Sequence, residues 1–385
     1  MYISDSVRYI GVDDHQVDLF EGQYAVPNGM SYNSYVILDE KIAVMDTVDT
    51  HFVDAWMENL RAELGGRQPD YLVVHHMEPD HSAGIRRFVE AYPAATVVAT
   101  AKAFPMMEQF FGQQIPAHRL TVGEGDTLSL GTHTLHFVTA PMVHWPEVMV
   151  SYEDSEKRLF SADAFGKFGA LDREEPWEDE ARRYYIGIVG KYGAQVQTLL
   201  KKAAALDIAA ICPLHGPVLT DDLTACLGLY DTWSAYRPEK AGVVVAYASV
   251  YGNTRQAALR LAERLREQDT PVEVFDLARC DLAEATAKAF CYDRLVLASV
   301  TYNGDVFPPM KAFLQHLTER NYRNRTVAFM ENGSWAPTAA KVMRAMLESC
   351  KDLRFAENSV RILSAPHEVA EEQIAALAQE LREDA

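Results

Sequence analysis

Short runs of apolar, often β-branched residues recur along the first half of the chain, and each ends in polar residues. The runs span residues 71–75, 134–138, 158–162 and 209–213. Runs of this length and composition predict buried strands. A helical pattern begins at residue 82, directly after the loop that follows the first run. Because α/β layers place ligands at strand-to-loop-to-helix junctions, the polar residues at these strand ends are the first candidates for a functional site.

A second pattern begins after a polar linker with Pro and Gly at residues 234–242. Five predicted strands alternate there with helical patterns, the first of which covers residues 255–267. This alternation predicts a doubly wound parallel sheet of flavodoxin type. A chain of 385 residues is also long enough for two domains, which we place at residues 1–237 and 243–385. The five strands are predicted at residues 243–248, 272–275, 294–298, 326–330 and 359–363.

The sequence His-Met-Glu-Pro-Asp-His at residues 76–81 follows the first predicted strand. We expect Pro79 to end the strand ladder and to favour a loop. In an extended segment residues two apart share a face, so the side chains at 76, 78 and 80 should point together while His75 points elsewhere. Four ligand-type residues in six positions indicate a metal site rather than a solvated loop.

Three more polar residues follow predicted strands in the same half, and with this run they complete a shell for two metal ions. Taken singly, such a histidine is more often a hydrogen-bonded core or surface residue, but the joint pattern favours metal binding. Mixed imidazole and carboxylate ligands suit redox-active iron or manganese better than hydrolytic zinc. The seven candidate ligands are His76, Glu78, Asp80, His81, His144, Asp163 and His215.

Three loops follow strands of the predicted flavodoxin-type sheet, and together they indicate an FMN site. The first combines hydroxyl and Gly residues with a helix start, where backbone N–H groups favour a phosphate. The other two carry Tyr302 and Trp335, between which a planar ring could stack. The chain has no Gly-x-Gly-x-x-Gly, which argues against a dinucleotide site. A sheet that has lost its flavin is the alternative. The candidate residues are Ser249, Val250, Tyr251, Gly252, Asn253, Thr254, Ser299, Thr301, Tyr302, Asn303, Gly304, Asn332, Gly333, Ser334 and Trp335.

The composition of the chain limits which partners the protein can bind and indicates the cellular compartment in which it works. The net charge of −19 argues against nucleic acid or an anionic membrane as a partner. No stretch is apolar enough to span a membrane, and the first residues lack a signal-peptide pattern. The five cysteines form no Cys-x-x-Cys pair, which excludes an attached rubredoxin or iron–sulfur module and fits a cytoplasmic protein. Electrons for a redox reaction must then come from a separate donor.

The ligand pattern resembles that of the flavodiiron proteins, or A-type flavoproteins. It differs from the His-x-His-x-Asp-His zinc signature of metallo-β-lactamase-fold hydrolases by one ligand, because Glu78 replaces the second histidine. Residues 29–35 and 184–197 are similar to further segments of the family. The resemblance implies a metallo-β-lactamase-like αββα domain followed by a flavodoxin-like domain.

The resemblance also implies which residues hold each of two irons. One iron would take His76, Glu78 and His144, the other would take Asp80, His81 and His215, and Asp163 would bridge them. In the family the histidine at the place of His81 is not always a direct ligand.

Two other positions of the family pattern concern residues close to the metals. Some members carry a histidine just before the segment that resembles residues 29–35, and here Pro27 stands at that place, which puts a role in proton delivery in doubt. Tyr192 is either a residue that approaches the metals from outside the ligands or a packed core aromatic, and the sequence leaves both open.

The function implied by the resemblance is reduction of dioxygen to water, of nitric oxide to nitrous oxide, or of both. Electrons would come from rubredoxin or another reduced donor and pass through FMN to the irons. In the family, head-to-tail dimers bring the flavin of one chain to the irons of the other, so we expect a homodimer or homotetramer. A zinc hydrolase with a flavodoxin-like appendage, and an electron carrier with a vestigial metal domain, are the alternatives.

Overall fold

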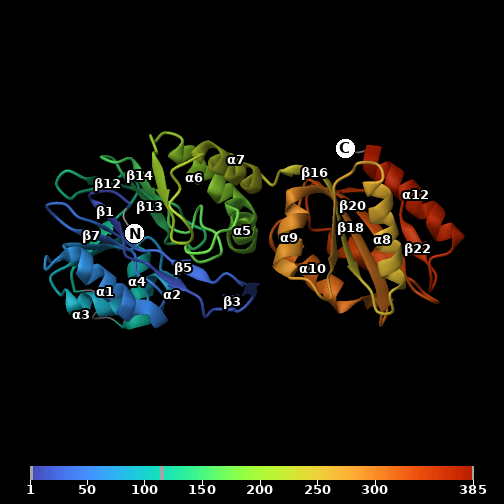
Figure 1. Cartoon of the computed structure of the whole chain (residues 1–385), viewed down its shortest axis with the longest axis horizontal. Helices are drawn as coiled ribbons and strands as arrows, with labels where there is room; N and C mark the ends of the chain where they lie inside the picture. Colours follow the sequence, from blue (N-terminus) through green and yellow to red (C-terminus); the bar gives the residue numbers. More distant parts are fainter. Residues whose placement is uncertain (1–2, 113–116, 384–385) are drawn as a thin grey trace. The chain divides into compact units, whose positions relative to one another are not determined.

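The computed structural model describes residues 3–112 and 117–383. The chain divides into two compact units, drawn in Figure 1 with the sequence running from blue to red. One comprises Met1–Tyr185 with Ala194–Asp231, and the other comprises Ile186–Gly193 with Thr232–Ala385. No helix of the described residues is long and apolar enough to cross a bilayer.

Two β-sheets form the centre of the first unit. In the first sheet β6 pairs antiparallel with both neighbours and the later strands run parallel. In the second sheet only the last pair is parallel. The first sheet has the strand order β1 (Val7–Tyr9), β6 (Tyr35–Ile37), β7 (Ala43–Met45), β8 (Tyr71–Val73), β9 (Thr96–Thr100) and β10 (Arg119–Val122). The second has the order β11 (Thr127–Ser129), β12 (Thr134–Thr139), β13 (Met149–Glu153), β14 (Arg158–Phe160) and β15 (Ala210–Cys212).

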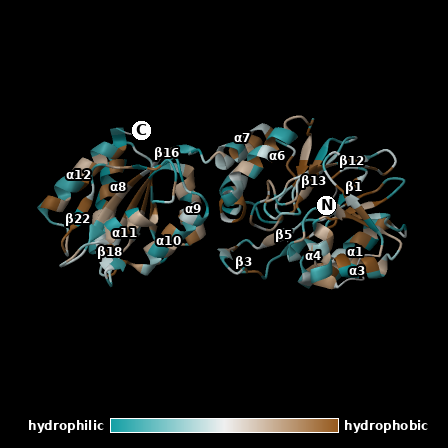
Figure 2. Cartoon of the chain, turned by 180° about the vertical axis from the view of Figure 1, so that it is seen from behind, coloured by the Kyte–Doolittle hydropathy of each residue, from teal (hydrophilic) through white to brown (hydrophobic). Residues whose placement is uncertain are grey.

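Apolar side chains from both sheets share one core cluster, as expected for two sheets packed face to face. Val73 of β8, Phe137 of β12 and Phe160 of β14 are all buried in it. Figure 2 shows brown, the colour of hydrophobic residues, on the strands of this unit beside the label β13. Two small antiparallel ribbons complete the strands of this unit, β2 (Val12–Asp14) with β5 (Met30–Tyr32) and β3 (Leu19–Phe20) with β4 (Tyr24–Ala25).

Helices cover the outer faces of the two sheets, which gives the αββα layers that the family resemblance implies. In Figures 1 and 2, α1, α3 and α4 lie on one side and α6 and α7 on the other. Helix α1 buries Trp56, Leu60 and Leu64, which recur every four residues on one face, and it ends at Gly65 with φ 56°. The helical segments of this unit are η1 (Thr50–Phe52), α1 (Val53–Leu64), α3 (Ile85–Ala91), α4 (Ala103–Phe111), α5 (Trp177–Tyr184), α6 (Gly193–Ala203) and α7 (Leu223–Ser234). Between α5 and α6, η2 (Tyr185–Val189) and η3 (Gly190–Tyr192) are grouped almost entirely with the second unit.

The segment after β8 differs from the expected loop. A short helix, α2 (Pro79–Ser82), begins at the proline itself. Proline fits the first position of a helix because its fixed φ is already helical and its missing N–H needs no partner there. Asp80 and His81 therefore project from a helical turn, and the prediction of one extended face for residues 76, 78 and 80 was wrong at Asp80.

The second unit contains the flavodoxin-type parallel sheet that the sequence predicts. Helices α8 and α12 cover one face, and α9, α10 and α11 cover the other (Figures 1 and 2). The sheet has the order β17 (Val272–Asp276), β16 (Lys240–Ala248), β18 (Tyr292–Tyr302), β20 (Thr326–Asn332) and β21 (Arg354–Phe355), with β22 (Val360–Ile362) also beside β20 and β19 (Asp305–Val306) beside β18. The helices are α8 (Asn253–Arg266), α9 (Leu282–Cys291), α10 (Pro308–Glu319), α11 (Ala339–Met346) and α12 (Glu368–Glu383).

The turn between β13 and β14 holds the N-terminal segment to the first unit through Glu156. This carboxylate accepts hydrogen bonds from the hydroxyls of Ser4 and Ser6 and from the guanidinium of Arg158. Burial alone would raise the pKa of Glu156, but these hydrogen bonds lower it from 4.5 to about 2.

Replacement of this carboxylate should therefore cost stability only where it is ionised in the folded protein, and the full cost should appear only above its pKa in the unfolded chain. We expect E156Q to lower the free energy of unfolding at pH 7 by about 1 kcal/mol, a value reduced by solvent screening. The difference from the unsubstituted protein should shrink as the pH falls from about 4.5 towards 2. Urea unfolding at pH 7 and pH 3 measures it, with E58Q on the exposed face of α1 as the control. A difference that stays constant over this range would contradict the assignment.

Candidate metal centre and flavin pocket

The run of candidate ligands leaves the end of β8 with His75 turned away from it, as the sequence predicts. Nδ1 of His75 lies 2.5 Å from Oδ2 of Asp46, and Nε2 lies 2.7 Å from Oγ of Ser151. Asp46 also accepts the backbone N–H of His75 at 2.7 Å. These contacts fix the start of the run in the core, so the following side chains face the opposite way.

His76, Glu78, His144 and Asp163 form one group of converging ligand atoms. Nε2 of His144 lies 3.0 Å from Oε2 of Glu78 and 3.1 Å from Oδ2 of Asp163. Nε2 of His76 lies 3.2 Å from the same oxygen of Glu78 and 3.3 Å from Oδ2 of Asp163. Two imidazoles and two carboxylates thus surround one point.

Asp80, His81 and His215 form a second group on the other side of Asp163. Nε2 of His81 lies 3.1 Å from Nε2 of His215, 3.2 Å from Oδ1 of Asp163 and 3.4 Å from Oδ2 of Asp80. Nε2 of His215 lies 3.3 Å from the same oxygen of Asp80. The structure therefore brings all seven candidate ligands together, with one oxygen of Asp163 turned to each group.

Sharp turns after two strands position the later ligands. Asp163 follows β14 in a turn in which Ala162 and Phe165 have φ values of 52° and 67°. His215 follows β15 and precedes Gly216, whose φ is 79°. A Cβ on Gly216 would lie 2.7 Å from Cγ of Lys167, so this turn has no space for a larger residue.

The charges of the two groups are strongly coupled. Burial alone would raise the pKa of Asp163, but the imidazoles of His81 and His76 hold it well below its usual range. Burial alone would lower the pKa of His144, but its hydrogen bonds to Asp163 and Glu78 raise it to about 9. The arrangement consequently favours anionic carboxylates with cationic charge between them.

These residues fit metal ions. Both carboxylate oxygens of Asp80 and Oδ1 of Asp163 are buried and accept no hydrogen bond from any described residue. The Nε2 atoms of His81 and His215 lie 3.1 Å apart, as expected for two imidazoles that bind the same metal ion. Buried polar groups without such compensation are costly, and a shell of imidazole and carboxylate donors is one that iron and manganese bind well.

Residues that touch the ligands from outside were missed in the sequence. Oε1 of Glu147 lies 2.8 Å from Nδ1 of His76, and the backbone oxygen of Ser31 lies 2.7 Å from Nδ1 of His215. The buried ring of Tyr184 lies 5.5 Å from the ring of His215. The only available signal was for Glu147, a carboxylate three residues after His144 in a largely apolar stretch.

The two family positions near the metals have different surroundings. Tyr192 is half-buried at the end of η3, and the aromatic ring of this stretch that contacts a candidate ligand is that of Tyr184. Pro27 is exposed. An acidic residue, Glu21, instead lies near Glu78, and burial together with the charge of Glu78 raises its pKa to about 7.

A cleft of about 470 Å³ reaches two of the candidate ligands. Phe20, Tyr32 and Phe52 contribute aromatic surface to it, and its carboxylates come from several segments. Its lining comprises Asp14, Gln16, Val17, Phe20, Glu21, Tyr32, Asp49, His51, Phe52, Glu78, Pro79 and Asp80. It therefore offers a path for a small molecule to the metal cluster.

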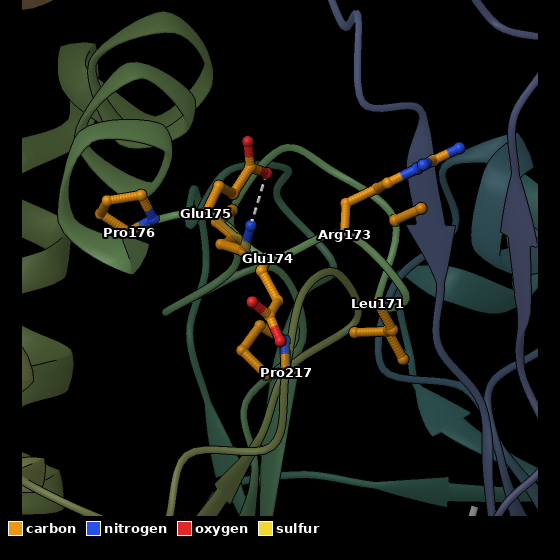
Figure 3. A pocket seen from close by; sticks show the side chains of 8 residues that line it. Leu171, Arg173, Glu174, Glu175, Pro176 and Pro217 are labelled. Carbon is orange, nitrogen blue, oxygen red and sulfur yellow. Dashed lines mark hydrogen bonds and ion pairs between the residues drawn. The ribbon is translucent and has the colours of Figure 1, made fainter.

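A separate hollow of about 480 Å³ lies beside the turn that follows His215, and Figure 3 shows its lining. The buried Lys167 donates to Oε1 of Glu175 at 2.7 Å across it. Pro217 closes one side. None of the seven candidate ligands lines this hollow, so we assign it no part in the metal site.

The second unit contains a pocket of about 530 Å³ at the ends of β16, β18 and β20. Thirteen of the fifteen residues predicted for FMN line it; Gly252 and Ser299 do not. Gly252 is the residue before α8 and has φ 93°, while Oγ of Ser299 accepts the N–H of Phe307. The sequence missed Val300, Ala336, Thr338 and Ser364, which also line the pocket.

The chemistry of this pocket suits an aromatic phosphate ester. The start of α8 has no side-chain cap, and its backbone N–H groups lie beside the side chains of Asn253 and Thr254, which line the pocket. No Lys or Arg is among the residues that line the pocket in the described structure, so a phosphate would rely on neutral donors. Tyr302 and Trp335 supply the aromatic surface.

Comparisons with protein-family models agree with this two-part architecture. Residues 30–216 match the model described as ODP family beta lactamase, and residues 244–358 match a flavodoxin domain. The anaerobic nitric oxide reductase flavorubredoxin of Salmonella arizonae is 28% identical over 361 residues, which cover 90% of this chain and 74% of that protein.

Two solved structures are similar to this chain over almost its whole length. The rubredoxin oxygen:oxidoreductase of Desulfovibrio gigas has a TM-score of 0.93 and 26% identity, with 100% of this chain and 98% of that chain covered. The flavodiiron protein of Giardia intestinalis has a TM-score of 0.90 and 25% identity, with coverages of 99% and 95%. The chain thus has the two-domain architecture of the flavodiiron proteins: it is an oxidoreductase with a beta-lactamase-like domain for a diiron centre and a flavodoxin domain for FMN.

Proposed function

We propose that this oxidoreductase reduces a small diatomic molecule, dioxygen to water or nitric oxide to nitrous oxide, with electrons from a separate reduced donor such as rubredoxin. The observation that carries the proposal is the pair of three-ligand groups that share Asp163. Support comes also from the names of similar proteins, which include a nitric oxide reductase and a rubredoxin oxygen:oxidoreductase.

The proposed ligands divide evenly between the two irons. His76, Glu78 and His144 would hold one, and Asp80, His81 and His215 would hold the other, and an oxygen of Asp163 is turned towards each group. When bound, FMN would supply electron transfer from the donor, and the iron pair would supply a site for binding and reduction of the diatomic. The imidazoles and carboxylates would hold and orient the irons, so no side-chain nucleophile is required.

The cleft would give the substrate access to the metals and supply the protons that its reduction consumes. Aromatic rings of Phe20, Tyr32 and Phe52 provide an apolar path that a small neutral molecule can follow. Reduction of dioxygen consumes four electrons and four protons and gives two water molecules. Reduction of two nitric oxide molecules consumes two electrons and two protons and gives nitrous oxide and one water. Carboxyl groups such as those of Asp14 and Glu21 are available in the cleft to carry these protons.

A hydrolytic zinc enzyme is less consistent with the same observations. Glu78 contributes an oxygen where hydrolases of this fold carry an imidazole, and a hydrolase would have no use for the pocket after β16, β18 and β20. Analysis of the bound metal separates the two functions, because a protein that contains zinc without iron and cleaves esters would be a hydrolase.

We also infer that the active form is a homodimer or homotetramer with a head-to-tail arrangement. All residues of the metal cluster belong to the first unit and all residues of the flavin pocket belong to the second. The resemblance to flavodiiron proteins implies that electrons cross between chains.

Iron binding should be linked to proton release. The contacts of His144 with Asp163 and Glu78 raise its pKa to about 9, so in chelator-treated protein at pH 7 this imidazole carries a proton that a metal must displace. We expect iron affinity to rise as the pH increases from about 6 to 9. Calorimetric titration in two buffers of different ionisation enthalpy measures the protons released. An affinity that does not change with pH would contradict His144 as a ligand.

Replacement of the shared carboxylate should separate the two halves of the reaction. We expect D163A to lower consumption of dioxygen and nitric oxide at least a hundredfold, because neither metal keeps its bridge, while reduction of FMN by the donor is unchanged. Oxygen uptake in air and nitric oxide uptake without air, with one rubredoxin donor, measure the effect. D172N, at an exposed carboxylate of the same unit, is the control. Unchanged turnover in D163A would contradict the proposed function. The same holds if the unsubstituted protein consumes neither gas.

Association should govern activity if electrons cross between chains. We expect turnover per chain to fall on dilution in step with the fraction of dimer measured by analytical ultracentrifugation. A protein that is monomeric at micromolar concentration and turns over fully would refute the head-to-tail inference and leave the reaction itself intact.

A further inference from the structure

The two groups of proposed ligands are matched in their donor atoms. Each contains two imidazoles and one carboxylate, and each receives one oxygen of Asp163. Ligand type and formal charge therefore give no reason for the two metals to differ. A difference, if one exists, has to come from the groups that the ligands contact on their outer sides.

Those outer contacts are not matched. Nδ1 of His76 lies 2.8 Å from a carboxylate oxygen of Glu147, whereas Nδ1 of His215 lies 2.7 Å from the neutral backbone oxygen of Ser31. Nδ1 of His81 is buried without a hydrogen-bond partner among the described residues. Only the His76 side of the cluster has an anionic partner in these contacts.

Glu147 is held firmly for this contact. Its side chain is fully buried, and Oε1 accepts both His76 Nδ1–H and the backbone N–H of Met77, the latter at 2.9 Å. The hydroxyl of Thr100 donates to the backbone oxygen of Glu147 at 2.9 Å. The residue thus comes from the loop that carries His144 and reaches across to the ligand run after β8.

The second oxygen of Glu147 shows that this carboxylate is not simply a structural hydrogen-bond acceptor. Oε2 is buried and has no hydrogen-bond partner among the residues that the structure describes. A neutral glutamine would satisfy both N–H donors, so the structure gives no local reason for a buried negative charge. The charge is balanced when the imidazole that it contacts is positively charged, through either a metal ion or a proton on its other nitrogen.

We propose that Glu147 is a positioning residue that makes the two metals unequal. An anionic acceptor on Nδ1–H fixes the tautomer that leaves Nε2 free and raises the electron-donating strength of that nitrogen. The iron at His76, Glu78 and His144 is then held more tightly and is harder to reduce than its neighbour. In the one-electron-reduced pair the ferric ion occupies the His76 side. This inference rests on the proposed ligand assignment and deepens it.

The test uses E147Q, which keeps the acceptor for both N–H groups and removes the charge. The matched control is E153Q: Glu153 is also buried, accepts two backbone N–H groups from Ser155 and Glu156, and lies at the far end of β13. Both variants are compared with the iron-loaded full chain by competition with a chelator and by a reductive titration followed by Mössbauer and electron paramagnetic resonance spectra.

In E147Q we expect one iron of the pair to be lost to the chelator about ten- to a hundredfold more readily while the other is retained. The two one-electron reduction steps should move closer together, and the mixed-valence signal should reach a lower maximum. E153Q should match the unsubstituted protein in both measurements. If E147Q does not accumulate as a folded protein, E147D keeps the charge at shorter reach and should show smaller changes in the same direction.

Equal weakening of both irons, or no change in either measurement, would overturn the inference. Such a result leaves the proposed function standing, since the unsubstituted protein would still contain an iron pair. If the unsubstituted protein binds zinc and no iron, the proposed function itself is wrong. That result is distinct from one that rejects only the role of Glu147, because it does not depend on the reduction potentials of the irons.

Discussion

Asp163 is a carboxylate enclosed in the protein interior with imidazoles on both sides, and the architecture of the first unit depends on keeping it there. A buried carboxylate needs hydrogen-bond donors or cations around it, and here two clusters of nitrogen and oxygen atoms provide places for cations. The ligands come from the ends of β8, β14 and β15 and from the loop between β12 and β13. A shift of any one of these strands would separate a ligand from the shared carboxylate, so sheet register and metal geometry constrain each other.

The flavin pocket of the second unit is also built from polar residues that follow the ends of strands, but it binds a ligand of the opposite charge. Its ligand is an anion, and the chain as a whole carries a net charge of −19. The pocket nevertheless has no Lys or Arg in its described lining and relies on the start of α8 and on neutral side chains. Backbone N–H groups need no long cationic side chain, which leaves space for aromatic residues such as Trp335 around a planar ring.

The sequence was a good guide to elements whose pattern is local. The apolar runs located β12, β16, β18 and β20, and ligand types at strand ends located all seven residues that the structure brings together. The prediction of a loop after β8 was wrong because a proline is compatible with more than one local structure. Pro79 can end a strand or begin a helix, and here it begins α2. The sequence was silent on Glu147, Ser31 and Tyr184 because their roles depend on contacts between distant segments. His215 and the oxygen of Ser31, for example, are 184 residues apart.

Glu78 has a consequence beyond the choice of metal. An imidazole at this position would give one group three nitrogens and one carboxylate, against two nitrogens and two carboxylates for the other, counting Asp163 in both. With Glu78 the two ligand sets become equal in type and charge. Equal ligand sets would favour equal metals, yet stepwise electron transfer is simpler when the two potentials differ. In such a centre a single buried charge at the outer edge of one imidazole can set the order of reduction, because nothing in the ligands themselves opposes it.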